Sequence, residues 1–493
     1  MPPAHKVEGE SPVHLHELKH AGRSPALPLS LSLSDSTGTS TLRLQRLLRV
    51  IPGQRYVGVG EWCGRPVLAK LLVGSKASRH FERERMGAQL LAERQQSTPQ
   101  LLAHGLREGE GGWLLFEYLD GSQGLGDAWQ AVANEPPLSE GQQSVLAEAL
   151  AALAGMHAQG LWQADLHLDN VLRHQGRLYL IDGGAVHAEG TRQPLSRARA
   201  LENLGLFFAQ LPGCFDPFLE ELVVHYLLVN GEHALPLELL QQEVARQRRG
   251  RLSAYLKKLG RDCTEFSAQR GLMGLQVVRR EEAAGLHGLL ADPDGAIEAG
   301  KSLKRGRSST VALVDVGGRS LVIKRYNIKG FGHWLKRFWR PSRAWHSWVE
   351  GNRLGFLGIA TPKPLAIIER RWCGLRGRSY LVTECIAGDN LLTRLPPDSQ
   401  RPAPDEELQA LQRLMADLAR ERISHGDLKG TNLLWDRNQW ALIDLDALCQ
   451  HAREGRFRAA FRKDRARLLR NWPAESILHG QVASLIPRLE ANN

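Results

Sequence analysis

The chain of 493 residues lacks the features that stabilise secreted proteins or hold proteins in a membrane. Its six cysteines are scattered and include no Cys-x-x-Cys pair, which argues against a disulfide framework or a zinc site and favours reduced thiols in a cytosolic compartment. No uncharged apolar run is long enough to span a membrane, and the N-terminus has no basic stretch followed by an apolar stretch of the secretory type. We therefore predict a cytoplasmic protein that is soluble or peripheral to a membrane.

Acidic residues are fewer than basic ones, and the formal net charge is +11. With 42% hydrophobic and 24% charged residues the composition is that of a globular protein, because disorder needs low hydrophobicity together with high net charge. The positive charge indicates an anionic partner, for which nucleic acid, an anionic membrane surface and phosphorylated substrates all qualify. The sequence contains no nucleic-acid recognition motif, so we expect no nucleic-acid partner.

The same spacing of an Asp, an Asn and a second Asp occurs twice. In the later copy Asp427 is followed by Asn432 after five residues and by Asp444 after twelve more, within HGDLKGTN and LIDLD. The earlier copy lies 262 residues upstream at each position, as Asp165, Asn170 and Asp182. The repeat predicts two related catalytic domains in one chain.

Three oxygen-bearing side chains at this spacing can converge on one site. One carboxylate can orient or deprotonate a hydroxyl group, while an amide and the second carboxylate can hold Mg²⁺, which prefers oxygen ligands and shares them with substrate phosphates. The pattern matches the catalytic loop and the metal-binding Asp of protein kinases. We therefore assign Asp165 and Asp427 to catalysis. The expected metal ligands are Asn170, Asp182, Asn432 and Asp444.

A kinase also needs a strand lysine that binds the phosphates of ATP and a helix glutamate that holds this lysine in place. Lys70 lies in the predicted strand PVLAKLL, and Glu84 follows fourteen residues later in a segment whose apolar residues have helical spacing. Glu82 is a competing candidate for the same role. In the second half Lys324 lies in the strand VIKRYN, and Glu350 follows after 26 residues.

The extra length before Glu350 contains a basic and aromatic segment. From Lys324 to Arg343 there are seven Lys and Arg residues and no Asp or Glu, and tryptophan and phenylalanine side chains are interleaved with them. Such a segment suits a membrane interface or an anionic saccharide. Alternatively, its tryptophans pack on the helix that carries Glu350 while the basic ends stay solvated. The aromatic residues concerned are Trp334, Phe338 and Trp339.

The pattern of elements predicts three regions and an α+β fold. Residues 1–41 are rich in Ser, Pro, Thr and His and are expected to be weakly ordered. Residues 42–262 and 263–493 each begin with short strands joined by tight turns and continue with amphipathic helices. We predict two tandem protein-kinase-like bilobal domains, each with a small antiparallel sheet as its N-terminal lobe and a mainly helical C-terminal lobe.

Both copies depart from the protein-kinase pattern. Neither has a full Gly-x-Gly-x-x-Gly loop, and the first copy has Gln163 where kinases usually have histidine. Only a short segment separates Asp182 from the next amphipathic helix, and it contains no Ala-Pro-Glu anchor. Because that long segment is a protein-kinase feature, its absence argues against a peptide substrate.

With these residues in place, both halves resemble the bacterial lipopolysaccharide core kinase family, whose members phosphorylate heptose or Kdo sugars of the inner core. The resemblance covers most of the chain from about residue 42. It is carried by HGDLKGTN with LIDLD, by VIKRYN, by EGNRLGFLGIATPKPLA and by LSRARALENLGLFFAQL of the first half. It implies ATP and Mg²⁺ as cofactors and an anionic lipopolysaccharide core saccharide as acceptor. It also implies peripheral contact with the anionic cytoplasmic face of the inner membrane.

Three other functions compete with this interpretation. A small-molecule kinase of the aminoglycoside or choline type shares the motif H-G-D-x-x-x-x-N, but its acceptors are cationic and the high positive charge argues against it. A protein kinase is disfavoured by the short segment after Asp182. A scaffold with degenerate kinase folds is disfavoured because both copies retain the Lys, Glu, Asp, Asn and Asp residues.

Overall fold

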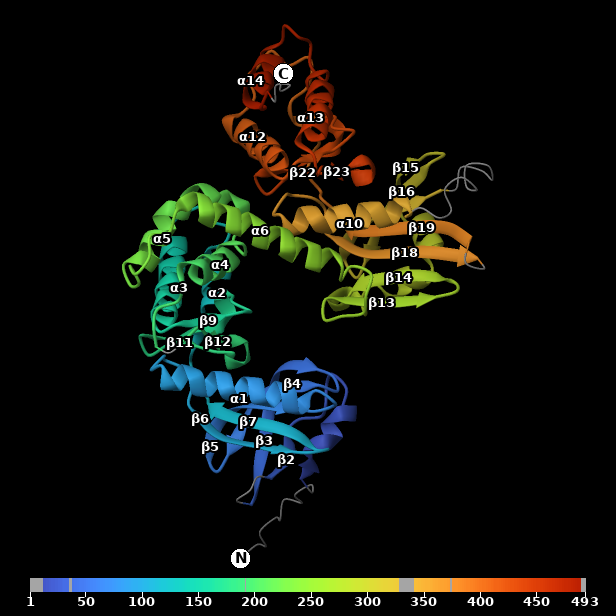
Figure 1. The fold of residues 1–493 in the computed structure, drawn as a ribbon. Coiled ribbons are helices and arrows are strands. Elements are labelled where there is room, and N and C mark those ends of the chain that lie inside the picture. The colour runs from blue at the N-terminus through green and yellow to red at the C-terminus, as the bar shows by residue number, and fades with distance from the viewer. Residues whose placement is uncertain (1–11, 35–37, 191, 328–340, 373–374, 489–493) are drawn as a thin grey trace, which may run out of the picture. The chain divides into compact units, whose positions relative to one another are not determined.

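The computed structural model describes residues 12–34, 38–190, 192–327, 341–372 and 375–488. The chain divides into two compact units, residues 1–248 and 249–493 (Figure 1). The boundary falls inside helix α6 (Leu237–Leu256) and not between residues 262 and 263 as predicted. Leu240 and Val244 of this helix are buried in the core of unit 1, and Leu252 is buried in a core of unit 2. Because one continuous helix contributes to both cores, no turn or loop residues mark the boundary in the sequence. The boundary predicted from the pattern of strands and helices therefore lies after the observed one.

Residues 12–34 are ordered, so the prediction of a weakly ordered tail is wrong for them. Strand β1 (Val13–His14), the 3-10 helix η1 (Leu15–His20) and strand β2 (Leu29–Ser34) form the edge of the first sheet. The serine content of this segment suggested weak order, but leucine and serine alternate along β2. This alternation is that of a strand with one buried face, on which Leu31 and Leu33 lie. Residues 1–11 of the predicted tail lie outside the described residues.

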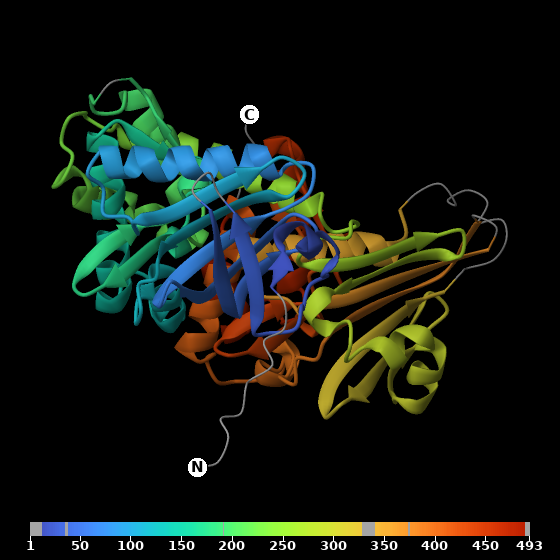
Figure 2. The same ribbon diagram turned by 90° about the horizontal axis from the view of Figure 1, so that it is seen from below.

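Unit 1 contains a seven-stranded sheet in the order β1-β2-β3-β4-β5-β7-β6. The helix α1 (Ala77–Glu93) runs along one face of this sheet (Figure 2). The short strands predicted from residue 42 form the centre of the sheet. The strands beyond β2 are β3 (Thr39–Ile51), β4 (Arg55–Trp62), β5 (Arg65–Leu72), β6 (Leu101–Arg107) and β7 (Gly111–Glu117).

The two faces of β5 have different partners, because successive side chains of a strand point to opposite sides. Ala69 and Leu71 are buried in the same core cluster as the leucines of η1. Leu72 is buried with Phe81 of α1 on the other face. Lys70 shares the face of Leu72, and the alternation of the strand therefore directs this lysine toward α1.

The rest of unit 1 is mainly helical. Its largest core cluster is built from the helices together with short strands that carry the catalytic-loop motif. The helices are α2 (Leu125–Val132), α3 (Glu140–Ala158), α4 (Arg197–Phe208), α5 (Leu219–Leu227) and the first part of α6. The short strands are β8 (Gln123–Gly124), β9 (Leu161–Gln163), β10 (Val171–His174), β11 (Arg177–Leu180) and β12 (Val186–Ala188).

Unit 2 repeats this plan. Its sheet is also seven-stranded, in the order β13-β14-β18-β19-β17-β16-β15. The strand that carries Lys324 is β17 (Arg319–Tyr326), the fifth in this order. Its residues Leu321 and Ile323 are buried in the same core cluster as Ile297 of helix α8 (Pro293–Ala299), whereas Tyr326 is buried with residues of helix α10 (Arg343–Phe356) on the other face. Lys324 shares the face of Tyr326. The other strands are β13 (Phe266–Gly271), β14 (Gly274–Arg279), β15 (Lys301–Arg305), β16 (Ser309–Val316), β18 (Pro364–Trp372) and β19 (Leu375–Glu384).

Helices again follow the sheet in unit 2, and the predicted α+β class is confirmed. The main ones are α12 (Asp405–Arg420), α13 (Glu454–Leu469) and α14 (Ile477–Leu485), with the short strands β20 (Ile423–Ser424), β21 (Leu433–Asp436), β22 (Gln439–Leu442) and β23 (Cys449–Gln450). Among the described residues, no helix combines the length and the apolar character needed to cross a bilayer. The predicted basic and aromatic segment with Trp334, Phe338 and Trp339 lies outside the described residues.

Candidate active sites of the two units

In unit 1 the strand lysine is held by the helix glutamate. The Lys70 Nζ lies 2.6 Å from Glu84 Oε2 and 3.3 Å from Asp182 Oδ1. Lys70 and Glu84 are both buried, whereas the competing Glu82 pairs with Arg85 on the outer side of α1 and is half exposed. Among the two glutamates considered, the structure therefore brings Glu84 to the lysine.

The Asp that follows the short strands adopts the same backbone conformation in both units. Asp182 has φ 64° and Asp444 has φ 59°, in the left-handed region that Asp tolerates better than most residues, and each precedes a 3-10 turn. Burial raises the pKa of the Asp182 carboxyl, but the Lys70 and Arg55 charges outweigh burial and hold that pKa below its ordinary value. Asp182 therefore remains a carboxylate at neutral pH, as a metal ligand must.

The catalytic loop of unit 1 is fixed by amide side chains. Asn170 is buried and donates from Nδ2 to the Asp165 carbonyl oxygen at 2.6 Å, which commits its amide nitrogen and leaves its carbonyl oxygen as the atom for a metal. Gln163 donates from Nε2 to the Ile181 carbonyl oxygen at 3.0 Å. Its own Oε1 is buried without a hydrogen-bond partner among the described residues.

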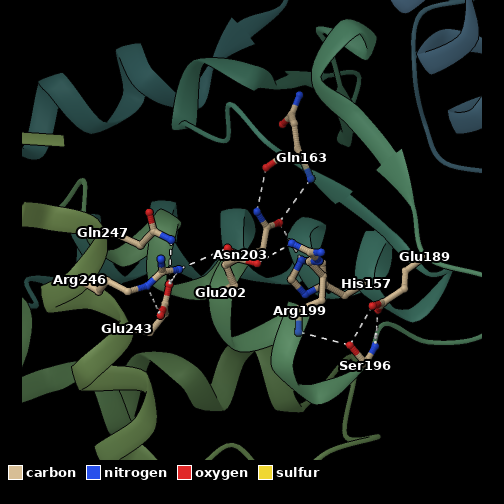
Figure 3. Close-up of polar contacts among 10 residues, drawn as sticks. All are labelled: His157, Gln163, Glu189, Ser196, Arg199, Glu202, Asn203, Glu243, Arg246 and Gln247. Atoms are coloured by element: carbon tan, nitrogen blue, oxygen red, sulfur yellow. Dashed lines mark hydrogen bonds and ion pairs between the residues drawn. The ribbon is translucent and has the colours of Figure 1, made fainter. Parts of the chain in front are cut away.

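Asn203 of α4 connects this loop to the helices (Figure 3). Its Nδ2 donates to the Gln163 carbonyl oxygen at 2.8 Å, and its Oδ1 lies 3.0 Å from His157 Nε2. The His157 Nδ1 lies 3.1 Å from the Tyr226 hydroxyl. Burial lowers the pKa of His157 to about 4, although the hydrogen bond with Asn203 opposes this shift. A neutral His157 with its proton on Nε2 satisfies both contacts.

Figure 3 also shows the ion pairs beside this network. Arg246 of α6 lies 2.6 Å from Glu243 and 3.3 Å from Glu202 of α4, measured from its Nη2 to a carboxylate oxygen of each. These side chains are partly exposed, so the ion pairs between α4 and α6 contribute little to stability.

A cavity of about 160 Å³ opens beside the predicted site of unit 1. The lining includes the carboxylates of Asp165 and Asp182 and the cationic side chains of Arg49 and Arg55. The two arginines flank the turn between β3 and β4, where the sequence has no glycine-rich loop. Guanidinium groups at this turn can bind phosphate through charged hydrogen bonds. A glycine-rich loop would bind phosphate with its backbone amides instead.

The catalytic loop of unit 2 has a histidine where unit 1 has Gln163. His425 is fully buried, and its Nε2 lies 3.0 Å from the Ile443 carbonyl oxygen, which is the counterpart of Ile181 at the repeat offset. The buried Asp464 of α13 accepts the backbone N–H groups of His425 at 2.6 Å and of Gly426 at 3.0 Å. Asp464 thus accepts from the backbone of His425, as Asn203 Oδ1 accepts from the backbone N–H of Gln163 at 3.4 Å in unit 1.

Asp427 and Asn432 lie together as predicted from their spacing. The Asn432 Nδ2 donates to the Asp427 carbonyl oxygen at 2.9 Å, as Asn170 does to Asp165. Two cations that the sequence analysis missed lie beside the Asp427 carboxylate: Lys429 Nζ at 3.1 Å and Arg467 Nη1 at 3.4 Å. The signal for Lys429 is the motif Asp-Leu-Lys, because unit 1 has His167 at the same offset.

Lys324 does not contact Glu350, and the predicted pairing of these two residues is wrong for this structure. Its Nζ lies 2.6 Å from Asp444 Oδ1 and 3.0 Å from Asp446 Oδ1. Glu350 is buried but pairs with Arg353 on its own helix at 2.7 Å. The helix position that faces the lysine site is Ser347, one turn before Glu350, so spacing alone selected the wrong carboxylate.

The ligands available for a metal are one carboxylate and one amide in each unit, Asp182 with Asn170 and Asp444 with Asn432. Within the described ranges, no three His, Cys, Asp or Glu side chains gather as a ligand set. Mg²⁺ usually binds proteins through one or two carboxylates and takes its remaining ligands from water and substrate phosphates. The oxygen donors present in both units therefore fit Mg²⁺ together with a nucleotide.

Comparison with known proteins finds a match for part of unit 2. Residues 304–487 match the lipopolysaccharide kinase (Kdo/WaaP) family. A comparison with curated proteins finds none that matches the chain. Among solved structures, WaaP in complex with acyl carrier protein is similar at 18% identity and a TM-score of 0.29, over 44% of this chain and 88% of that one. Vaccinia related kinase 3 is similar at 16% identity and a TM-score of 0.26, over 48% of this chain and 79% of that one.

Proposed function

We propose, from the match of residues 304–487 to the lipopolysaccharide kinase (Kdo/WaaP) family, that this phosphotransferase moves the γ-phosphate of ATP to a sugar hydroxyl of the lipopolysaccharide inner core. The acceptor sugar is a heptose or Kdo. We place the protein in the cytoplasm, in peripheral contact with the inner membrane where this acceptor is assembled. The observation that carries the proposal is the convergence of Lys324, Asp444, Asn432 and Asp427 in unit 2.

Asp427 acts on the acceptor in this proposal. Its carboxylate is partly exposed, so a sugar hydroxyl can reach it, and it orients the hydroxyl and accepts its proton as attack proceeds. Lys429 and Arg467 lie beside it and stabilise the negative charge of the transferred phosphoryl group. Catalysis then consists of positioning and charge stabilisation without a covalent enzyme intermediate.

The nucleotide is held by the other residues of the site. Lys324 neutralises its phosphates, and Asp444 and Asn432 would hold Mg²⁺, which would offset the negative charge of the phosphates. His425 keeps the loop in register with the metal-binding Asp through its contact with the Ile443 carbonyl oxygen. The same roles fall to Lys70, Asp182, Asn170 and Asp165 in unit 1, where Glu84 holds the lysine.

An anionic acceptor fits the charges around Asp427 better than a cationic one. The basic side chains of Lys429 and Arg467 face the carboxylate that receives the hydroxyl. A site for an aminoglycoside or for choline would instead need carboxylates to bind the cationic acceptor. A phosphorylated saccharide on a lipid is therefore the partner that we assign to unit 2.

The test is transfer of labelled phosphate from ATP to purified lipopolysaccharide that lacks core phosphate. Asp427→Asn in the full chain should lower the transfer rate by about a hundredfold or more, since it removes a group that acts on the transition state. Asp398→Asn is a matched control, because Asp398 is exposed and distant in sequence from every assigned residue. Equal rates for wild type and Asp427→Asn would reject the assignment.

A further inference from the structure

The glutamate of unit 1 and a glycine of the same unit occupy adjoining space. A Cβ atom added to Gly184 would lie 2.8 Å from Glu84 Oε1 and 2.9 Å from its carboxyl carbon. Gly184 is two residues after the metal-binding Asp182. A side chain at position 184 would thus enter the volume that the Glu84 carboxylate fills beside Lys70.

Unit 2 has a carboxylate at the corresponding position of its own sequence. Asp446 is two residues after Asp444 and lies 262 residues after Gly184, which is the repeat offset. Its Oδ1 lies 3.0 Å from Lys324 Nζ and accepts a hydrogen bond from the Ser347 hydroxyl at 2.8 Å. Ser347 lies on α10, the helix that corresponds to α1, and it is buried.

We propose that Asp446 takes in unit 2 the role of the helix glutamate, and that the carboxylate which positions the catalytic lysine has moved from the helix to the segment after the metal-binding Asp. Unit 1 combines Glu84 on the helix with Gly184 after the metal Asp. Unit 2 combines Ser347 on the helix with Asp446. In each unit one of the two positions carries the carboxylate and the other is small, so a single carboxylate fits beside the lysine.

The charges around the lysine agree with this exchange. In unit 1 the Glu84 carboxylate lies 2.6 Å from Lys70 and 3.7 Å from Arg55 Nη1. In unit 2 the Asp446 carboxylate contacts Lys324 and also forms an ion pair with Arg343. One lysine and one arginine therefore surround the carboxylate in both units, although the arginines come from different elements.

Asp446 is held more firmly than a carboxylate on the protein surface would be. The Tyr326 hydroxyl donates to its Oδ1 at 2.7 Å, in addition to the bond from Ser347. The ion pairs with Lys324 and Arg343 and these hydrogen bonds hold the carboxylate in place, and it fixes the lysine ammonium group for the phosphates of the nucleotide.

This inference rests on the proposed function, and its test uses the full chain with unit 1 silenced by Asp182→Asn. In that background we compare Asp446→Asn, Asp446→Gly and the double variant Ser347→Glu with Asp446→Gly, which gives unit 2 the residues of unit 1. Transfer kinetics with varied ATP and varied lipopolysaccharide give separate KM values. Titration with Mg-ATP gives the dissociation constant, and thermal unfolding of each variant shows whether the fold is retained.

We expect Asp446→Asn and Asp446→Gly to lower kcat/KM for ATP at least tenfold while the KM for lipopolysaccharide changes less than twofold. The double variant should recover most of the loss. Values within twofold of the background for both single variants, or a folded double variant no better than Asp446→Gly, would overturn the inference. If neither the wild type nor any variant transfers phosphate, the proposed function fails. The role of Asp446 is then judged from the dissociation constant of Mg-ATP: tenfold weaker binding by Asp446→Asn supports the role, and unchanged binding rejects it.

Discussion

The two units place a lysine among carboxylates by different means. In unit 1 Lys70 pairs with Glu84 of the helix that lies along the sheet, while in unit 2 Lys324 pairs with Asp444 and with Asp446, which lies two residues later. The catalytic loops differ as well, since Gln163 makes in unit 1 the backbone contact that His425 makes in unit 2. Both units have a carboxylate beside the lysine and a side-chain nitrogen bonded to the isoleucine carbonyl oxygen, but different residues supply these atoms.

The units also differ where the acceptor would bind. The Asp427 carboxylate has Lys429 and Arg467 beside it. At the same repeat offset as Lys429, unit 1 has His167, whose Nδ1 lies 3.4 Å from Asp169. Unit 2 therefore places two cationic side chains beside its loop aspartate, whereas unit 1 pairs its strand lysine with a helix glutamate, as protein kinases do.

The largest expected effect separates the two catalytic aspartates. Asp427→Asn should lower phosphate transfer about a hundredfold or more, and Asp165→Asn should lower it no more than about threefold, because Lys429 has no lysine counterpart in unit 1. The measurement is the initial rate of transfer to lipopolysaccharide with both variants at equal concentration. A large loss in Asp165→Asn with a small loss in Asp427→Asn would reverse the assignment of the active unit.

The supports of the two loops should differ in strength. Asp464→Ala leaves two buried N–H groups, those of His425 and Gly426, without their charged acceptor and should destabilise unit 2 by about 3 kcal/mol. Asn203→Ala removes neutral hydrogen bonds from unit 1 and should cost about 2 kcal/mol. Urea unfolding of the full chain measures both changes. A loss for Asp464→Ala no greater than that for the exposed Asp398→Ala would contradict this account.

The pH dependence of stability should be stronger in unit 1. The folded-state pKa of His157 is about 4, below its ordinary value of 6.5, so as the pH falls from 6.5 the unfolded chain binds a proton that the folded unit does not. The free energy of unfolding should fall by roughly 2 kcal/mol between about pH 7.5 and about pH 5, and this contribution becomes negligible above about pH 7.5.

Burial also lowers the pKa of His425 in unit 2, but the carboxylates of Asp464, Asp444 and Asp427 oppose the shift, so the acid dependence there should be weaker. Urea unfolding at several pH values, followed for each transition, makes the comparison. His157→Gln should remove the slope from unit 1. An unchanged slope in this variant would show that another group is responsible.

The smallest effect is expected from exchanging the residues at the start of the two loops. Gln163→His should leave stability unchanged or raise it by up to about 1 kcal/mol. Histidine can keep the hydrogen bond to the Ile181 carbonyl oxygen, and it removes Gln163 Oε1, which is buried without a hydrogen-bond partner among the described residues. Thermal unfolding of the variant, with His425→Gln as its converse, measures this. A loss above about 2 kcal/mol for Gln163→His would mean that the two loops are not equivalent.

Much of the arrangement could be predicted from the sequence where one motif fixes a whole contact. The spacing of Asp, Asn and Asp predicted that Asn432 lies beside Asp427, and the two are hydrogen bonded because the short loop keeps them close. The strand that carries Lys70 and the helix that carries Glu84 were both expected, and they meet in the structure. The α+β class followed from strands that precede helices in each half.

The remainder depends on contacts between segments that are far apart in sequence. Glu350 follows Lys324 at a sequence separation that suits the pairing of a strand lysine with a helix glutamate, but it pairs with Arg353. Asp446 pairs with the lysine because the fold brings the segment after Asp444 next to β17. The alternation of leucine and serine in residues 29–34 was hidden by the polar composition around it. Helix α6 contributes to a core on each side of the boundary between the units, which no change of composition marks.

The mass of the core saccharide tests the central claim most directly. Lipopolysaccharide core is isolated from cells that lack this gene and from the same cells carrying either the wild-type gene or the Asp427→Asn variant, and its phosphate content is measured by mass spectrometry. We predict one phosphate fewer without the gene, restored by the wild type and not by the variant. A phosphate content that is the same in all three strains would contradict the assignment of this chain as a kinase of the lipopolysaccharide core.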